Sequence, residues 1–312
     1  MVTLVDIRAA RERIAGRVRR TPLLRVAPVR EPAGPGSLWL KLENLQVIGS
    51  FKARGAASKL GTLPREALTR GIITASGGNH GLGVAYAGWI AEVPATIYLP
   101  GNTPPAKAKA LEAWGARVVT EGTVWDDANR AALAVAARDG LTYFHPFADP
   151  AVIAGQGTVG LEILEDLPDV DTVVVAIGGG GLISGIGVAI KALRPRARVV
   201  GVEPVGAPTL HESLRAGRLV ELPEIRTAAT TLAPRRSESI NLQLIRETVE
   251  TIVLVEDEEM RAAAQWLWRE LGVAAELSSA AAVAALQSGR IAIRHDEKVC
   301  ALVCSAGTDG LG

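Results

Sequence analysis

Short apolar runs rich in β-branched residues alternate along this chain with longer stretches of helical periodicity. The runs that predict strands are Ile72–Ala75, Ala95–Leu99, Arg117–Thr120, Thr172–Ile177, Val199–Val202, Thr251–Val255 and Val299–Val303. The helical stretches between them include Gly81–Ala91, Pro105–Trp114, Trp125–Arg138, Ile183–Leu193 and Glu258–Leu271. Such alternation is typical of an α/β architecture in which mostly parallel strands carry helices on both faces.

Composition excludes several classes of function. The 34 basic residues are balanced by 33 acidic ones, so no broad charged field predicts nucleic-acid binding. The uncharged stretch from Thr172 to Ile190 contains four consecutive glycines, which disfavour a membrane-spanning helix. The first twenty residues lack the apolar core of a secretory signal. Two cysteines, Cys300 and Cys304, form neither a disulfide framework nor a recognisable zinc site, so we expect a reduced, cytoplasmic protein with no membrane partner.

A run of glycines is the strongest candidate for a ligand site. Gly178, Gly179, Gly180 and Gly181, with Leu182, follow a continuous apolar strand and precede an apolar helix. Backbone N–H groups at such a turn converge on an anion, and the helix N-terminus adds positive potential. The run therefore predicts a phosphate site, although no Lys-Ser or Lys-Thr follows as in a Walker loop.

A second glycine pattern, Gly155–Gly160, matches the dinucleotide fingerprint G-x-G-x-x-G letter for letter. A dinucleotide site needs this pattern directly after a strand, whereas here the preceding residues from Asp149 read as the start of a helix. We therefore expect these glycines to serve close helix packing, and a dinucleotide oxidoreductase remains a minor alternative.

Three shorter motifs could complete a site. Lys52 follows the aromatic Phe51, and a lysine that forms a Schiff base must be partly desolvated, but a lone lysine in a sequence is nearly always a solvated surface group. Ser76–Gly81 closes a strand and opens a helix, where it could bind a carboxylate or act as an ordinary N-cap. Ser305–Thr308 ends the last strand, where ligands bind in open α/β sheets, or forms a plain turn.

The order of these motifs resembles that of one enzyme family. In chain order they are TPL (Thr21–Leu23), KLEN (Lys41–Asn44), SFKARGA (Ser50–Ala56), SGGNHG (Ser76–Gly81), AGQGT (Ala154–Thr158), GGGGL (Gly178–Leu182), GVEP (Gly201–Pro204) and SAGT (Ser305–Thr308). Together they resemble the fold-type II pyridoxal-phosphate enzymes, whose fold is like that of the tryptophan synthase β-subunit. The resemblance is greatest to serine/threonine dehydratase, also called threonine deaminase, and to serine racemase. It extends from about residue 4 to the C-terminus.

The resemblance implies a role for each matching residue. Lys52 would hold pyridoxal 5'-phosphate as a Schiff base and move the α-proton, and Ser76 would join it in catalysis. Phe51 would cover the cofactor ring, Asn79 would bind its phenolic oxygen, and Ser305 would face its ring nitrogen. The remaining cofactor contacts would come from the backbone of Gly178–Leu182. The substrate carboxylate would be bound by Ser76, Gly77, Asn79 and His80.

The resemblance also implies two lobes and one reaction. Residues 1–64 and 145–312 would form a large cofactor-binding domain, and residues 65–144 a small mobile domain that closes over the substrate. The expected reaction converts L-threonine or L-serine to a 2-oxo acid and ammonia by β-elimination, in a homo-oligomer, by expectation a dimer. The alternatives are a dehydratase for 3-hydroxyaspartate or phenylserine, and a non-catalytic protein that binds the cofactor or an amino acid.

The chain departs from its relatives at several positions. Gly77 stands where racemases have a serine, so we expect poor racemisation. A cation site near Glu203 and Ala207 lacks an acidic ligand, because Thr209 replaces it. Glu276-Leu-Ser-Ser-Ala replaces the usual Glu-Pro-x-Gly-Ala, which changes the surroundings of Glu276.

Two details bear on chemistry and specificity. A neutral hydroxyl at Ser305 is expected to stabilise a protonated ring nitrogen less than a carboxylate would, which suits elimination better than transamination. Arg235 and Arg236 could pair with a second substrate carboxylate, or they could form a solvated pair on a loop.

Overall fold

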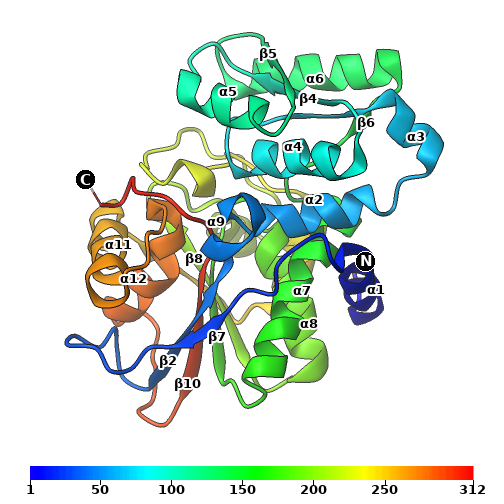
Figure 1. Ribbon diagram of the computed structural model, residues 1–312. Helices are drawn as coiled ribbons and strands as arrows, with labels where there is room; N and C mark the ends of the chain where they lie inside the picture. The colour runs from blue at the N-terminus through cyan, green and yellow to red at the C-terminus, as the bar shows by residue number, and fades with distance from the viewer. Residues whose placement is uncertain (312) are drawn as a thin grey trace.

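The computed structural model describes residues 1–311 and contains two sheets in which nearly all strands are parallel (Figure 1). The six-stranded sheet has the order β1-β2-β10-β7-β8-β9, and only the pair β1 and β2 is antiparallel. Its strands are β1 (Leu23–Arg25), β2 (Ser37–Leu42), β7 (Thr172–Ala176), β8 (Arg198–Pro204), β9 (Thr251–Val255) and β10 (Lys298–Val303). The four-stranded sheet has the order β5-β4-β3-β6 and consists of β3 (Ile72–Ala75), β4 (Ala95–Leu99), β5 (Arg117–Thr120) and β6 (Thr142–Tyr143). The predicted α/β class is confirmed.

Helices cover both sheets. They are α1 (Leu4–Ile14), α2 (Lys52–Leu60), α3 (Arg65–Arg70), α4 (Asn79–Ala91), α5 (Pro105–Glu112), α6 (Trp125–Asp139), α7 (Pro150–Asp166), α8 (Gly181–Leu193), α9 (Thr209–Ala216), α10 (Ser239–Thr248), α11 (Asp257–Leu271) and α12 (Ala281–Gln287). In Figure 1 the elements from α3 to β6 lie together as an upper lobe, and α2 passes beneath them. Helix α2 packs against both α4 and α7, so it joins the two parts of the molecule.

The main core surrounds the six-stranded sheet. Every residue of β7 is buried, and so are five of the six residues of β10. Continuous apolar runs of this kind are typical of parallel strands that are covered on both faces. Helices α7 and α8 lie to one side of the sheet and α11 and α12 to the other (Figure 1). Among the residues described, no helix is long and apolar enough to cross a membrane.

The glycines of the pattern Gly155–Gly160 lie inside helix α7. Asp149 caps this helix by accepting hydrogen bonds from two backbone amides of its first turn. A Cβ on Gly157 would stand 2.8 Å from the carbonyl oxygen of Gly185 on α8, and one on Gly160 only 2.9 Å from the Cβ of Ala189. The prediction of close helix packing is confirmed, and a dinucleotide fingerprint directly after a strand is excluded.

A cluster of four buried charges lies under helix α2. The guanidinium group of Arg54 is fully buried, and it donates two hydrogen bonds of 2.8 Å to Glu43. It also donates to Glu162 on α7 at 2.7 and 2.9 Å. Lys41 on β2, which is fully buried too, donates to the same carboxylate at 2.6 Å. Two cations thus face two carboxylates, and the buried charge is balanced.

Hydroxyl and carbonyl groups complete the cluster. Thr158 on α7 accepts a hydrogen bond of 3.2 Å from Arg54, and the carbonyl oxygen of Thr21 accepts one of 2.7 Å from Lys41. Burial alone would lower the pKa of Arg54, but the two carboxylates hold it above its ordinary value. The motifs TPL, KLEN, SFKARGA and AGQGT each contribute a residue to this one cluster, which therefore fixes α2 on the large sheet and on α7.

The cluster predicts a large loss of stability on removal of Arg54. Arg54→Met would leave two buried carboxylates without their main partner, and we expect the free energy of unfolding to fall by about 3–5 kcal/mol. Denaturant unfolding measures this loss. Arg138→Met is the matched control, because Arg138 pairs with Asp139 at the surface, where solvent screens the ion pair and it contributes little to stability. Equal losses in the two variants would contradict the role of the cluster.

Candidate active site

Lys52 is the first residue of helix α2, and the end of strand β10 fixes the chain just before it. The amide of Phe51 donates to the carbonyl oxygen of Cys304, and Ser50 forms an isolated β-bridge with Ser305. The amine of Lys52 donates to the carbonyl oxygen of Pro146 at 2.6 Å and lies 5.2 Å from the centroid of the Phe51 ring. Lys52 is partly exposed as a residue, but its amine is withdrawn from water, and this desolvation lowers the pKa of Lys52 to about 8. It is not a solvated surface lysine.

The glycine run connects β7 to α8 and packs against Phe147. A Cβ on Gly179 would lie 2.2 Å from the ring of Phe147, and one on Gly181 would lie 2.5 Å from its carbonyl oxygen. Gly180 has φ +93°, a left-handed conformation that favours glycine. At Gly178, a Cβ would lie 2.7 Å from the carbonyl oxygen of Thr231. Close packing on Phe147 and Thr231 therefore requires glycine at these positions.

The backbone of the run is oriented by its carbonyl groups. The carbonyl oxygen of Gly179 accepts hydrogen bonds from Ser237 at 2.9 Å and from Asn241 at 2.8 Å. In a trans peptide the N–H points opposite to the C=O, so the N–H of Gly180 points away from these two side chains. Within residues 1–311, no protein acceptor takes the N–H groups of residues 178–182. Free amides at the N-terminus of α8 suit a phosphate group.

A short loop connects the lysine to the glycine run. His145 accepts hydrogen bonds through Nδ1 from the amides of Phe147 and Ala148, and burial, with a smaller contribution from the charge of Lys52, lowers the pKa of His145 to about 4. The loop presents the carbonyl oxygen of Pro146 to Lys52 and that of Phe147 to the amide of Asn241. Asn241 could not be predicted from the sequence, because its partners Phe147 and Gly179 lie far away in the chain.

The motif SGGNHG joins β3 to α4, as predicted. Ser76 accepts a hydrogen bond from the amide of Gly78, and Asn79 begins the helix. His80 is buried, and its ring nitrogen Nε2 lies 3.1 Å from the hydroxyl of Thr74 and 2.9 Å from the carbonyl oxygen of Phe144. Burial, aided by Lys52, lowers the pKa of His80 to about 3, so the ring is neutral. The imidazole therefore points into the core. Only the backbone N–H of His80 is left at the N-terminus of α4, where a ligand could bind.

Glu276 connects this motif to the end of β10. One carboxylate oxygen accepts a hydrogen bond of 2.9 Å from the side-chain amide of Asn79. The other accepts from the hydroxyl of Ser305 at 2.8 Å and from that of Ser278 at 3.0 Å. The hydroxyl of Ser279 lies 2.8 Å from that of Ser305. The changed segment around Glu276 therefore surrounds the carboxylate with hydroxyl groups and joins two predicted cofactor ligands.

Glu203 has a structural partner at the start of helix α9. Its carboxylate accepts hydrogen bonds from the amides of Leu210 and His211 at 2.9 and 2.8 Å. Burial raises the pKa of Glu203 to about 8, although these two amides oppose the shift. Ala207 is buried nearby in the chain, and Thr209 donates to a backbone carbonyl oxygen. The described part of the chain holds no group of three or more His, Cys, Asp or Glu residues that could bind a metal ion.

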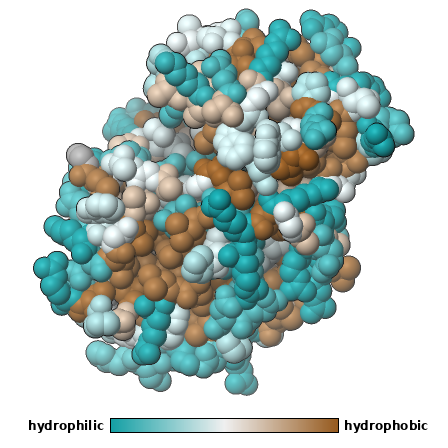
Figure 2. All heavy atoms as spheres, viewed as in Figure 1, coloured by the Kyte–Doolittle hydropathy of each residue, from teal (hydrophilic) through white to brown (hydrophobic). Residues whose placement is uncertain are grey.

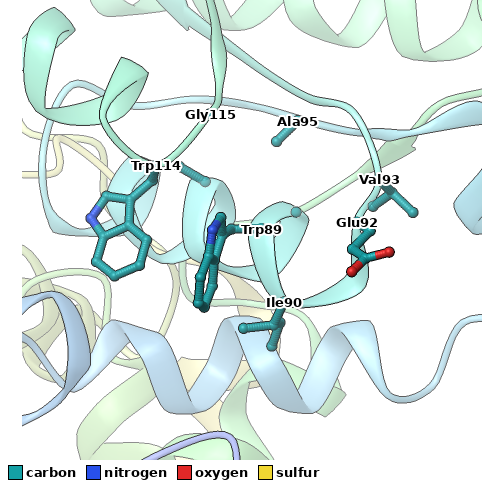
Figure 3. A pocket seen from close by; sticks show the side chains of 9 residues that line it. Trp89, Ile90, Glu92, Val93, Ala95, Trp114 and Gly115 are labelled. Atoms are coloured by element: carbon teal, nitrogen blue, oxygen red, sulfur yellow. The ribbon is translucent and has the colours of Figure 1, made fainter.

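A separate surface pocket lies on the upper lobe (Figure 3). It measures about 560 Å³, and its lining includes Trp89, Glu92 and Trp114. Trp89 and Trp114 meet edge to face with ring centroids 5.6 Å apart, and Tyr86 packs against both. None of the residues that line this pocket belongs to the site around Lys52. The candidate site residues described above therefore lie outside this pocket, at the carboxyl ends of β3, β7 and β10.

The donor set fits pyridoxal phosphate. Lys52 offers an amine of lowered pKa for the aldehyde, and the free amides of residues 178–182 suit the phosphate. Ser305 and Asn79 offer polar groups that are held by Glu276. These residues come from four segments that are distant in the sequence, and the fold assembles them at the carboxyl ends of strands from both sheets.

Comparisons with known proteins agree with this chemistry. The family model described as pyridoxal-phosphate dependent enzyme matches residues 14–305. An L-threonine ammonia-lyase of Thermotoga maritima is 43% identical over 286 residues, which are 92% of this chain and 71% of that protein. One of Geobacter sulfurreducens is 42% identical over 302 residues, 97% of this chain and 75% of that protein. A catabolic L-threonine dehydratase of Staphylococcus aureus is 36% identical over 311 residues, which are 99% of this chain and 90% of that protein.

Solved structures show the same fold over nearly the whole chain. Serine racemase of maize superposes with a TM-score of 0.93 at 32% identity, over 98% of this chain and 93% of that one. The processed threonine deaminase isoform 2 of Solanum lycopersicum gives a TM-score of 0.93 at 36% identity, over 98% of this chain and 89% of that one. The two-lobed fold-type II architecture is thereby confirmed. This chain belongs to the pyridoxal-phosphate dependent enzyme family.

Proposed function

We propose that this protein catalyses the pyridoxal-phosphate dependent β-elimination of L-threonine or L-serine, which yields a 2-oxo acid and ammonia. The observation that carries the proposal is the placement of the desolvated Lys52 amine next to Phe51 and the loop that packs on the glycine run. Relatives at 36–43% identity that act on L-threonine support this substrate class. An assay of 2-oxo acid release from threonine, serine, 3-hydroxyaspartate and phenylserine tests it. Release from 3-hydroxyaspartate or phenylserine alone would assign a different substrate, and no release would favour a binding protein.

Each residue has a defined task in this proposal. The bound cofactor withdraws electron density from the α-carbon of the substrate and so makes its proton acidic. Lys52 accepts that proton, since its lowered pKa leaves a large neutral fraction near pH 8. The hydroxyl of Ser76 and the backbone N–H groups of Gly77, Asn79 and His80 bind the substrate carboxylate at the N-terminus of α4. Loss of the β-hydroxyl as water, followed by hydrolysis, releases the products.

The remaining cofactor contacts in this proposal are those that the resemblance implies. The free amides of residues 178–182 would bind the phosphate, and Phe51 would cover the ring. Asn79 would bind the phenolic oxygen, and Ser305 would face the ring nitrogen. We assign no metal ion to Glu203 and Ala207, because the Glu203 carboxylate already caps α9. The dinucleotide alternative has no support, since its glycines lie inside a helix.

The lobes, the assembly and the cell compartment are part of the proposal. Residues 65–144 contain the whole four-stranded sheet, and we propose that they move as a small domain against residues 1–64 and 145–312. We propose a homodimer, for which the apolar residues exposed on the lower lobe in Figure 2 and the exposed Leu24 on edge strand β1 offer a surface. The two free, buried cysteines suit a cytoplasmic protein.

Arg235 bears on the choice among substrates. It is exposed, and its guanidinium donates to the carbonyl oxygens of Leu222 and Pro223 while pairing with Glu221 at 3.7 Å. These contacts favour the solvated pair on a loop over a second substrate-carboxylate site. They support threonine and serine, which carry one carboxylate, rather than 3-hydroxyaspartate.

Replacement of the lysine provides the first test of the mechanism. Lys52→Ala removes both the amine that holds the cofactor and the base, so we expect turnover of threonine to fall below detection. The visible absorption band of the lysine-bound cofactor should be absent from the variant, and borohydride should remove it from the wild-type protein. Lys59→Ala, in the same helix, is the control and should keep the band. Dehydration at the wild-type rate by Lys52→Ala would refute the assignment.

The lowered pKa of Lys52 predicts a pH dependence. Only the neutral amine attacks the cofactor aldehyde, so the rate of cofactor capture by the apoprotein should rise with pH up to about 8 and level off above it. A lysine of ordinary pKa, 10.5, would give a rate that keeps rising well beyond pH 9. Stopped-flow absorbance with excess pyridoxal phosphate measures the profile. A continued rise to pH 10 would show that the amine is not desolvated.

Gly77 predicts that racemisation is slow. A proton must return from the cofactor face opposite Lys52, and a placed acid contributes about 10²–10⁴-fold to such a step. Gly77 has no side chain, and the hydroxyl of Thr103 would be 3.8 Å from a Cβ placed there. We expect D-serine to form from L-serine at least about a hundredfold more slowly than pyruvate. Chiral chromatography measures the ratio, and comparable rates would mean that another group, such as Thr103, supplies the proton.

A further inference from the structure

Another surface pocket of the upper lobe is lined by three arginines. It measures about 480 Å³ and lies where α3 ends and where β4 and β5 begin, beside the last turn of α6. Its charged lining residues are Arg70, Arg117, Arg138 and Asp139. The candidate active site uses the carboxyl ends of strands, whereas this pocket lies at the amino ends of β4 and β5. The two sites are therefore separate.

Only one of the three arginines has an acidic partner. Arg138 donates to Asp139 through Nε and Nη2 at 2.7 and 2.8 Å. Arg70 and Arg117 are exposed, and within residues 1–311 neither takes part in a hydrogen bond or an ion pair. Arg70 nevertheless lies against the end of α6, since a Cβ on Gly140 would stand 2.7 Å from its Nη1. The pocket thus carries two positive charges that no carboxylate of the described chain balances.

The hydroxyl of Tyr98 also lacks a partner in the protein. Of the three tyrosines in the chain, Tyr86 donates to the carbonyl oxygen of Arg17, and Tyr143 donates to the side chain of Asn129. Tyr98 is only 8% exposed, and its hydroxyl has no hydrogen bond to any described residue. A buried hydroxyl without a partner is destabilising. Because Tyr98 lines the pocket, water or a ligand oxygen can supply that partner.

The strand register gathers these polar groups on one face of the small sheet. Thr96 and Tyr98 are two residues apart on β4, so their side chains point to the same face. Arg117 on β5 is the register partner of Thr96 and lies beside it on that face. The hydrogen bond with Asp139 raises the pKa of Arg138, and the hydroxyl of Tyr98 adds to this, so Arg138 lies near the same hydroxyl. Guanidinium groups and a free hydroxyl therefore converge on one pocket.

We propose that this pocket binds a small organic phosphate ester, whose oxygens accept hydrogen bonds from Arg70, Arg117 and the hydroxyl of Tyr98. Such an ester carries a charge of about −1.5 to −2 near pH 7, which matches the two unpaired guanidinium groups. The planar fork of a guanidinium also fits two phosphate oxygens at once. The rest of the wall offers apolar side chains to the organic part of the ester, from Val119, Val135 and Leu141. None of these residues takes part in the chemistry of Lys52, so the inference does not rest on the proposed function.

Calorimetric titration of the cofactor-loaded protein with phenyl phosphate tests the proposal. The cofactor occupies the proposed phosphate site at residues 178–182, so the probe reports on a second site. We expect one phenyl phosphate to bind per chain, more weakly as salt is raised. Phenyl sulfate has the same shape but a single negative charge, and it should bind at least about tenfold more weakly. Equal affinities for the two probes would contradict a site for a dianion.

Variants of the lining residues locate the site. Arg70→Met and Arg117→Met should each weaken phenyl phosphate binding about tenfold, and Tyr98→Phe, which removes only the hydroxyl, about fivefold. Arg65→Met is the matched control, because Arg65 is exposed on the same helix as Arg70 but does not line the pocket, so the affinity should not change. Thermal unfolding verifies that each variant is folded.

Three results would overturn the inference. They are the absence of binding to the wild-type protein, an unchanged affinity in any of the three pocket variants, and a loss in Arg65→Met equal to that in Arg70→Met. Failure of the wild-type protein to take up the cofactor would contradict the proposed function instead. The same titration of the unloaded chain would then test the pocket, because the variants distinguish it from the glycine run.

Discussion

The ion pairs of Arg54 with Glu43 and Glu162, deep beneath helix α2, determine where the reactive lysine lies. Burying these charges costs solvation free energy, and that cost is offset only when every charge has a partner of opposite sign. Lys41, which pairs with Glu162, completes the balance. The cluster therefore allows helix α2 only one position against β2 and α7. Lys52 begins that helix two residues before Arg54, so the same contacts that balance the charges also place the amine. Residues of four of the shared motifs thus act together by fixing the position of α2.

From this anchor the site is assembled by backbone contacts. The carbonyl oxygen of Pro146 receives the amine of Lys52, and the neighbouring Phe147 packs so closely on the glycine run that a Cβ could not be accommodated there. Asn241 and Ser237 hold the carbonyl oxygen of Gly179, which leaves the adjacent N–H group free for an anion. Lys52, the loop of Pro146 and Phe147, and the glycine run are therefore connected by packing and hydrogen bonds, and the desolvation of the amine follows from these contacts.

The sequence predicted those features that depend on local pattern. Strand β7 is a continuous apolar run that is buried along its whole length, and its bounds agree with the predicted Thr172–Ile177 to within one residue, because burial on both faces leaves little choice of residue. The helical prediction for Gly155–Gly160 is confirmed for a different local reason, because Asp149 marks the start of the helix just before these glycines. What local pattern could not reveal were partners distant in the chain: the two-residue strand β6, the ring of His80 directed to Phe144, and the hydroxyl groups around Glu276. Each depends on tertiary contacts that no short window contains.

The central claim is that Lys52, and no other lysine, carries the cofactor at the end of the glycine run. Borohydride reduction of the loaded protein, followed by proteolysis and mass spectrometry of the peptides, tests it most directly. The account predicts one modified peptide, with the phosphopyridoxyl group on Lys52. Modification of a different lysine, such as Lys41 or Lys59, or the absence of any modified peptide, would contradict it.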